Sequence, residues 1–301
     1  MSLLHPVARL SLSEFSVHPS TTIGIAIFAA AYIWRAKQGP SAADRLPVTV
    51  TAATADAGQL DMAAAPQGPT PAQRLAYFSS LALLFLTLNG PLHDLSDFYL
   101  FSGHMVQHLI LTLIVPPLML KGTPGWMLHP LVRHPTVYPL VRRVTSVQAC
   151  FVIFNLVLAF WHLPPLYNLA LAQHAVHILQ HLMFIGASLL MWWPLLSPLP
   201  ELPRAPYPAQ MLYCFLMVIP MSIISIYIAM ADTLLYPAYA AAPRILGITP
   251  MEDQQYGGLI MWVPGGIFFY AVMTVVFFKW SQRGEDTEAS AQVGWMPTAS
   301  S

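Results

Sequence analysis

HMVQHLILTLIVPPLMLKG, residues 104–122, is apolar enough to cross a membrane, yet it carries His104 and His108. A second apolar stretch carries His177 and His181 at the same four-residue spacing. Residues four apart lie on one face of a helix, and an ionisable side chain inside a membrane span is costly, which makes a functional role the default hypothesis. The two pairs therefore predict a metal or cofactor site between membrane helices.

The composition is that of an integral membrane protein. Of 301 residues, 56% are hydrophobic and 9% are charged, against about 25% charged in ordinary soluble domains. The 13 Lys and Arg form no basic tract and are balanced by 13 Asp and Glu, so nucleic acid is not an expected partner. Cys150 and Cys214 lie in different apolar stretches without a Cys-x-x-Cys motif, which predicts neither a disulfide framework nor a thiolate metal site.

Stretches of about 20 mostly apolar residues predict transmembrane helices. We expect an all-α, polytopic membrane helix bundle of about seven transmembrane helices, at approximately 20–34, 74–90, 98–120, 145–163, 174–193, 209–231 and 257–279. The first is the shortest. Because its positive charges follow the apolar run instead of preceding it, we interpret it as a retained span and not as a signal peptide.

The placement of Lys and Arg predicts the orientation, since cytoplasmic loops carry the excess of positive charge. With alternating loops, all of the 13 except Arg9 and Arg244 fall on one side. We therefore expect the N-terminus outside and the C-terminus in the cytoplasm. The predicted parts are an outer N-terminal segment with the first span (1–36), a flexible cytoplasmic linker (37–72), a six-helix His-rich membrane domain (73–281) and a disordered cytoplasmic tail (282–301).

This orientation places the paired histidines in the outer half of the membrane. His162 ends its span at the same level, and His174 begins the fifth span, while His93 is interpreted as an interfacial side chain and His18 as a surface residue. Three or four imidazoles suit copper, zinc or iron. Methionines in the outer halves of their spans would favour Cu(I), although methionine also fills packing gaps; they are Met105, Met183, Met230 and Met261.

Acidic and aromatic residues on the outer side have two interpretations each. Asp253, just before the last span, could orient a ligating imidazole or cap a helix N-terminus; we favour the first. Asp94 and Asp97 admit either use. Tyr236 and Tyr239, in the outer loop, fit an interfacial aromatic belt.

Five motifs resemble, in the same order, the CtaG family of cytochrome c oxidase assembly factors, which are multi-spanning bacterial membrane proteins. The motifs are HMVQHLILTLIVPPLMLKG (104–122), FNLVLAFWHLPPLYNLAL (154–171), HILQHLMF (177–184), WWPLL (192–196) and DQQYGGLIMWVPGG (253–266). The resemblance covers about residues 75–280. It places the family's motif histidines on His104, His108, His162, His177 and His181, and its acid before the last span on Asp253.

The resemblance implies a metallochaperone of the bacterial inner membrane that assembles a haem–copper oxidase, and not an enzyme. Its partners would be the lipid bilayer, cytochrome c oxidase subunits and other copper chaperones. Our hypothesis is that His104, His108, His177 and His181 bind copper, with zinc as the alternative metal. His162 and His174 would be auxiliary ligands, and Asp253 would orient one ring.

Two other classes remain open. A zinc-dependent intramembrane hydrolase would activate a metal-bound water, with Ser102 and Asp253 as its candidate residues. A b-type haem protein would need histidine ligands for its iron, but no span has the widely spaced histidine pair of a protein that holds two haems.

Overall fold

The computed structural model describes residues 15–41, 44, 68–132 and 134–294, and the regular secondary structure of this part of the chain is all helix, without a strand. The all-α prediction is confirmed. The helices are α1 (Pro19–Gln38), α2 (Pro71–Thr87), α3 (Pro91–Phe98), α4 (Phe101–Leu109), η3 (Ile110–Ile114), α5 (Val115–Gly122), α6 (Gly125–Val132), α7 (Tyr138–Val144), α8 (Val147–His162), α9 (Pro164–Ala172), α10 (His174–Leu196), α11 (Tyr207–Ala229), η4 (Pro237–Tyr239) and α12 (Pro250–Gly294).

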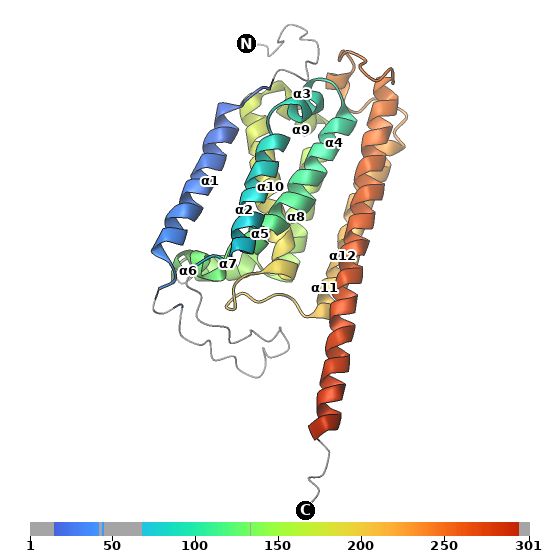
Figure 1. Ribbon diagram of the computed structural model, residues 1–301. Coiled ribbons are helices and arrows are strands. Elements are labelled where there is room, and N and C mark those ends of the chain that lie inside the picture. Colours follow the sequence, from blue (N-terminus) through green and yellow to red (C-terminus); the bar gives the residue numbers. More distant parts are fainter. Residues whose placement is uncertain (1–14, 42–43, 45–67, 133, 295–301) are drawn as a thin grey trace, which may run out of the picture.

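Length and hydropathy identify fewer membrane spans than the sequence predicted. Four helices qualify among the described residues: Phe101–Gly122, His174–Leu196, Tyr207–Ala229 and Pro250–Arg283. The count rises to six if each of two bent pairs, α2 with α3 and α7 with α8, makes one span. The weakest predicted span, α1, is not among them, although it runs lengthwise beside α2 (Figure 1).

Two predicted boundaries shift. The linker is shorter than 37–72 because α1 continues to Gln38 and α2 begins at Pro71, with Thr70 and Gln73 forming a capping box; most of the linker lies outside the described residues. The predicted tail begins at residue 282, whereas in the structure α12 continues to Gly294. This stretch contains Glu, Ala and Gln, which favour helix.

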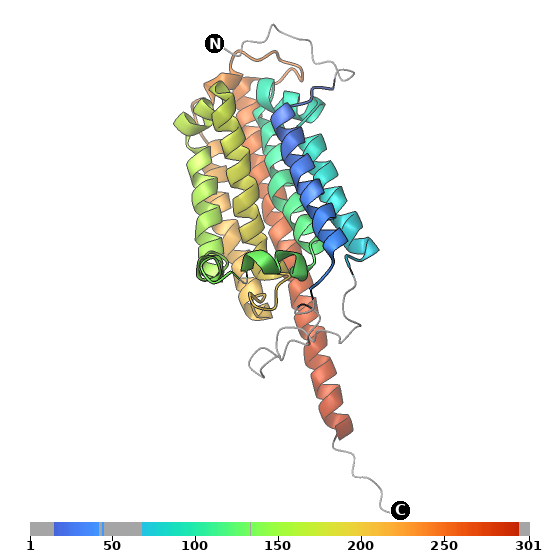
Figure 2. The same ribbon diagram turned by 90° about the vertical axis from the view of Figure 1, so that its left-hand side faces the viewer.

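The span that carries His104 and His108 lies at the centre of the bundle. In its apolar 18-residue window 67% is buried inside the protein, against 28–44% in the corresponding windows of the other three spans. It packs against α2 and α10 on its α5 half and against α12 on its α4 half, and the two views show α8, α10 and α11 completing the ring of helices around it (Figures 1 and 2). A central span explains how imidazoles can be kept away from lipid.

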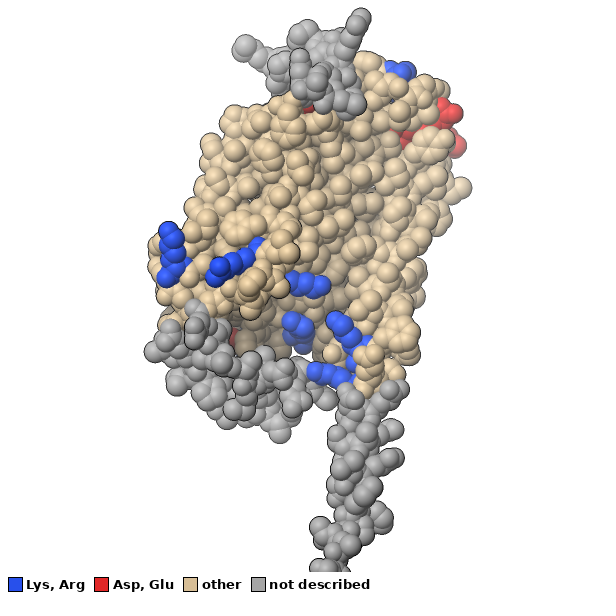
Figure 3. Space-filling view, in the orientation of Figure 1, with Lys and Arg blue, Asp and Glu red and all other residues tan. Residues whose placement is uncertain are grey.

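Charge marks one end of the bundle. Lys and Arg gather at the end where α6 and α7 lie (Figure 3). The described exception is Arg244, which lies between η4 and α12 and donates to the carbonyl of Tyr239. By the rule that positive charge remains in the cytoplasm, the opposite end, which holds α3 and α9 and is called the α3 end below, would face the outer compartment.

A local break separates the two halves of the central span. Pro116 and Pro117 have no N–H, so the carbonyl of Thr112 has neither an i+4 nor an i+5 amide partner. The chain passes through the π-turn η3 here, in which Val115 N–H donates to Ile110. The indole Nε1–H of Trp192, on α10, donates to Thr112 O at 2.9 Å. A side chain therefore supplies the hydrogen bond that the prolines remove.

We expect Trp192→Phe to destabilise the protein more than Trp193→Phe does. The first change leaves a buried carbonyl without a donor, which costs roughly 1–3 kcal/mol, whereas the indole N–H of Trp193 has no acceptor among the described residues. Thermal unfolding of both variants in the same detergent measures the difference. Equal melting temperatures would show that the Thr112 carbonyl does not need this donor.

Candidate metal centre

The two predicted histidine pairs come together at the α3 end. His104 and His108 project from α4, and His177 and His181 from α10; all four are buried. Within each helix the ring centroids are 4.2 and 4.4 Å apart. Between the helices they are 6.0 Å for His104–His177, 6.3 Å for His104–His181 and 5.9 Å for His108–His181. The four rings form the histidine cluster.

These centroid distances can be compared with the distance expected for two imidazole rings that bind the same metal ion. A metal bound to an imidazole nitrogen at ~2.0–2.1 Å lies roughly 3.2 Å from the ring centroid, so two rings that share it have centroids within roughly 6.5 Å. The three distances between α4 and α10 all fall below this limit. The arrangement is compatible with one ion bound by imidazoles of both helices.

An acid from α3 completes one side of the cluster. Asp97 lies 3.9 Å from His104 Nδ1 and 3.3 Å from His177 Nδ1. One ligand atom from each of these three residues lies within 4.8 Å of the other two, and they are the only such group of three among the described residues. Gly90, with φ of 69°, turns the chain into α3 and so brings Asp97 over the cluster. Asp97 is thus a better candidate ligand than Asp253.

His93 holds this acid in place. It is buried, and its Nε2 lies 3.4 Å from Asp97. The amide of Gln107 lies 3.0 Å from His93 Nδ1 and donates to Thr87 O at 2.8 Å. If the amide N–H also donates to Nδ1, the ring proton is on Nε2 and points toward Asp97. His93 is therefore an internal side chain, and the interfacial interpretation is wrong.

Six of the eight ring nitrogens of the histidine cluster are buried and make no hydrogen bond to the described residues. Neither nitrogen of His104 or His108 has a hydrogen-bond partner among the described residues, nor has Nε2 of His177 or His181. A buried polar atom without a partner costs roughly 1–3 kcal/mol, so packing alone does not account for the arrangement. Unpartnered imidazole nitrogens are the donor set that copper and zinc use.

The auxiliary histidines lie on opposite sides of the cluster. His162 is buried, and its centroid is 6.2 Å from that of His108. Its Nδ1–H donates to Leu158 O at 2.7 Å, which leaves Nε2 free for a metal. His174 is exposed, and its ring contacts His18, with centroids 6.2 Å apart. The structure brings His162 to the cluster but leaves His174 at the surface.

His18, interpreted from sequence as a surface residue, extends the series of rings. Its centroid is 4.4 Å from that of His93, which in turn is 5.8 Å from that of His177. The chain before α1 is fixed on the α2–α3 corner, because Gly90 N–H donates to Ser16 O and the Ser16 hydroxyl to Asp94. Burial lowers the pKa of His18, while Asp94 opposes this. A lowered pKa favours the neutral ring, which can bind a metal.

Asp253 does not contact the cluster. Its carboxylate accepts from Phe101 N–H at 2.7 Å, from Ser102 N–H at 3.1 Å and from the Ser102 hydroxyl at 2.5 Å. It therefore caps the N-terminus of α4, the helix of His104 and His108, and the prediction that it orients one ring is replaced by this role. Ser102 and Asp253, the candidate residues for a zinc-dependent hydrolase, both take part in this cap.

Tyrosines close the α3 end of the cluster. Tyr236 and Tyr239 are buried, so the aromatic-belt interpretation is wrong for both. Tyr236 donates to His162 O at 2.9 Å, and Tyr239 donates to Ser96 O at 2.7 Å. Tyr167, from α9, lies with its centroid 5.1 Å from that of His104. The segments at the α3 end thus cover the rings and limit their contact with water.

Comparison with known proteins identifies a family. The family model described as cytochrome c oxidase caa3 assembly factor (Caa3_CtaG) matches residues 57–283. No curated protein and no solved structure matches the chain. The match includes every residue of the histidine cluster and Asp97, but it begins after His18.

Proposed function

The chain belongs to the CtaG family of cytochrome c oxidase assembly factors, and from this premise we propose that it binds copper in the histidine cluster and delivers it to the oxidase. The observation that carries the proposal is the convergence of four buried imidazoles from α4 and α10, with unpartnered nitrogens and Asp97 beside them. Within an assembly factor for a copper enzyme, such a donor set suits copper.

Delivery requires that the ion can leave as well as bind. Neutral imidazoles with one carboxylate hold copper less permanently than a closed set of thiolates would, and both cysteines of the chain are distant in sequence from the cluster. Transfer to a partner needs an open side. The series His174, His18 and His93 leads from the exposed surface at the α3 end to the cluster, and we propose it as the route of uptake or release.

The side of transfer follows from the charge distribution. If the end with the Lys and Arg residues faces the cytoplasm, the cluster opens to the outer compartment of a bacterial inner membrane. Subunits of the oxidase that receive copper there, and chaperones that supply it, would dock at the α3 end. We propose no catalytic role for the cluster.

Disruption of the gene tests this function in the cell. We expect cytochrome c oxidase activity in membranes to fall to background at trace copper and to recover in part when copper is added, because excess copper bypasses a delivery step. Reintroduction of the intact gene is the control and should restore activity without added copper. Unchanged activity in the disrupted strain at trace copper would reject the proposal.

A further inference from the structure

A second group of metal-binding side chains lies deeper than the histidine cluster. A cavity of about 20 Å³ has His108 on one wall and His162 on another. This is room for about one water-sized sphere. His108 is four residues further along the span than His104, or about 6 Å deeper at 1.5 Å per residue. The side chains that line the cavity and matter here are His108, His162, Met105, Met221 and Met261.

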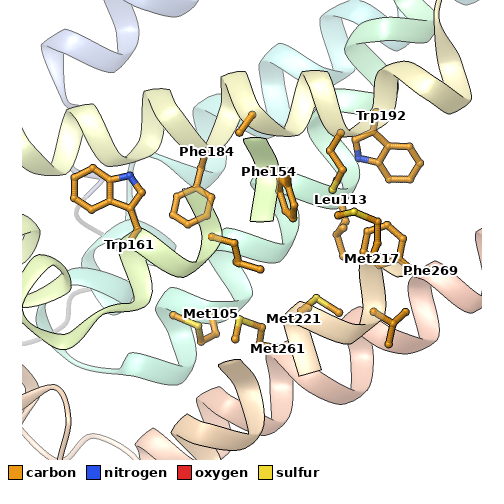
Figure 4. Packing of buried hydrophobic residues seen from close by; sticks show 14 of the residues in the cluster. Met105, Leu113, Phe154, Trp161, Phe184, Trp192, Met217, Met221, Met261 and Phe269 are labelled. Atoms are coloured by element: carbon orange, nitrogen blue, oxygen red, sulfur yellow. The ribbon is translucent and has the colours of Figure 1, made fainter. Parts of the chain in front are cut away.

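The methionines come from three different helices. Met105 lies on α4, Met221 on α11 and Met261 on α12, and all three are buried (Figure 4). Methionine fills packing gaps in many cores, but here the thioether side chains share a cavity with two imidazoles. His108 has no partner at either nitrogen among the described residues, and His162 has none at Nε2.

The backbone of α12 leaves space for these thioethers. Gly257, Met261 and Gly265 are spaced by four and so lie on one face of the helix. A Cβ at Gly265 would lie 3.0 Å from the sulfur of Met221 and 2.8 Å from its methyl carbon, and a Cβ at Gly257 would lie 3.3 Å from Cγ of Met105. A side chain at Gly265 would push Met221 from its place beside the cavity, whereas one at Gly257 would first meet the ring of Phe101 and press on Met105 less closely.

The set of ligands suits one kind of ion. Thioether and imidazole are neutral, and soft sulfur ligands select Cu(I) over harder divalent ions. The cost of burying an ion rises with the square of its charge, so a monovalent ion enters a cavity without a carboxylate far more readily than Zn²⁺ or Cu²⁺. Asp97, the acid of this region, faces His104 and His177 in the histidine cluster and does not line the cavity.

We propose that this cavity, between His108, His162 and the three methionines, is a Cu(I) site that makes the protein selective for cuprous ion. This rests on the proposed function. His108 belongs to both groups, because its ring is 5.9 Å from His181 and 6.2 Å from His162. His108 could therefore pass an ion from the histidine cluster to the cavity. The ion remains Cu(I) throughout, so the transfer needs no reductant.

X-ray absorption of the purified full-length protein, loaded with one equivalent of Cu(I) under reductant, tests the site directly. We expect sulfur as well as nitrogen in the first coordination shell of the intact protein. In Met221→Leu/Met261→Leu the sulfur signal should fall to that of the one remaining thioether, Met105, and Cu(I) affinity should fall by about tenfold or more. Zn(II) affinity should change less than about threefold, because the histidine cluster is intact.

The leucine variant should fold, since Met and Leu have similar volumes and such exchanges cost less than about 1.5 kcal/mol. Met191→Leu is the matched control: Met191 is equally buried in the same core but does not line the cavity, and its change should affect neither the spectrum nor the affinity. The spectrum of the intact protein needs no variant at all.

The outcomes separate this inference from the proposed function. Cu(I) bound only by nitrogen, with unchanged affinity in the double methionine variant, would overturn the cavity site and leave copper binding by the cluster in place. An intact protein that binds no copper in either oxidation state would overturn both.

Discussion

Replacement of both His104 and His108 by alanine is expected to lower copper affinity by more than about 100-fold. The two rings supply half of the histidine cluster, and His108 also lines the deeper cavity. Loss of a residue that merely supports a ligand costs about 10–100-fold in metal affinity, so loss of two ligands should exceed that range. Titration of the purified protein against a copper chelator of known affinity measures the change.

Thermal stability gives a second measurement that does not depend on the chelator. A ligand at 100 times its dissociation constant stabilises the folded state by about 2.7 kcal/mol, so copper should raise the melting temperature of the intact protein but not that of the double variant. His134→Ala is a suitable control, because His134 is exposed in the loop at the opposite end and its ring contacts Thr136. Undiminished copper binding by the double variant would reject the histidine cluster as the site.

The parts of this site that depend on local geometry could be predicted from sequence. A spacing of four residues fixes two rings on one helix face wherever that helix lies. The apolar setting of both pairs implied that they face the interior of a bundle. The structure shows both, with the α4 and α10 rings within 6.3 Å of each other.

Asp97 and His93 were harder to place, although the signal was present. They are themselves four apart, and Pro91 is a good first residue for a short helix. What the sequence does not contain is the bend of 47° between α2 and α3, which lays this helix across the cluster. His18 depends on a still longer-range contact, between the segment before α1 and the α2–α3 corner.

The predicted count of about seven spans is not confirmed, and the difference concerns α1 and the two bent helix pairs. Hydropathy alone does not distinguish a helix that faces lipid from one that packs against a bundle. The first predicted span became α1, which packs on α2 and is not among the candidate spans. The family match begins at residue 57, so it does not test α1.

Asp253→Ala is expected to destabilise the protein by roughly 2–5 kcal/mol, because the buried amides of Phe101 and Ser102 and the Ser102 hydroxyl would lose their acceptor. The first N–H groups of a helix have no partner within the helix, and at α4 this carboxylate supplies it from a residue about 150 positions away. Chemical or thermal unfolding in detergent measures the loss.

The neighbouring acid provides the control. Glu252 is exposed and accepts from Thr249 N–H at the start of its own helix, so Glu252→Gln should change stability by less than about 1 kcal/mol. The same pair distinguishes a cap from an orienting residue. If Asp253 acts only on the α4 N-terminus, Asp253→Ala should bind copper with nearly normal affinity at temperatures where it is folded. A large loss of affinity without a loss of stability would instead restore the direct role that the sequence suggested. On this account the cap contributes to the stability of the fold: it holds the first turn of α4, the helix that carries His104 and His108.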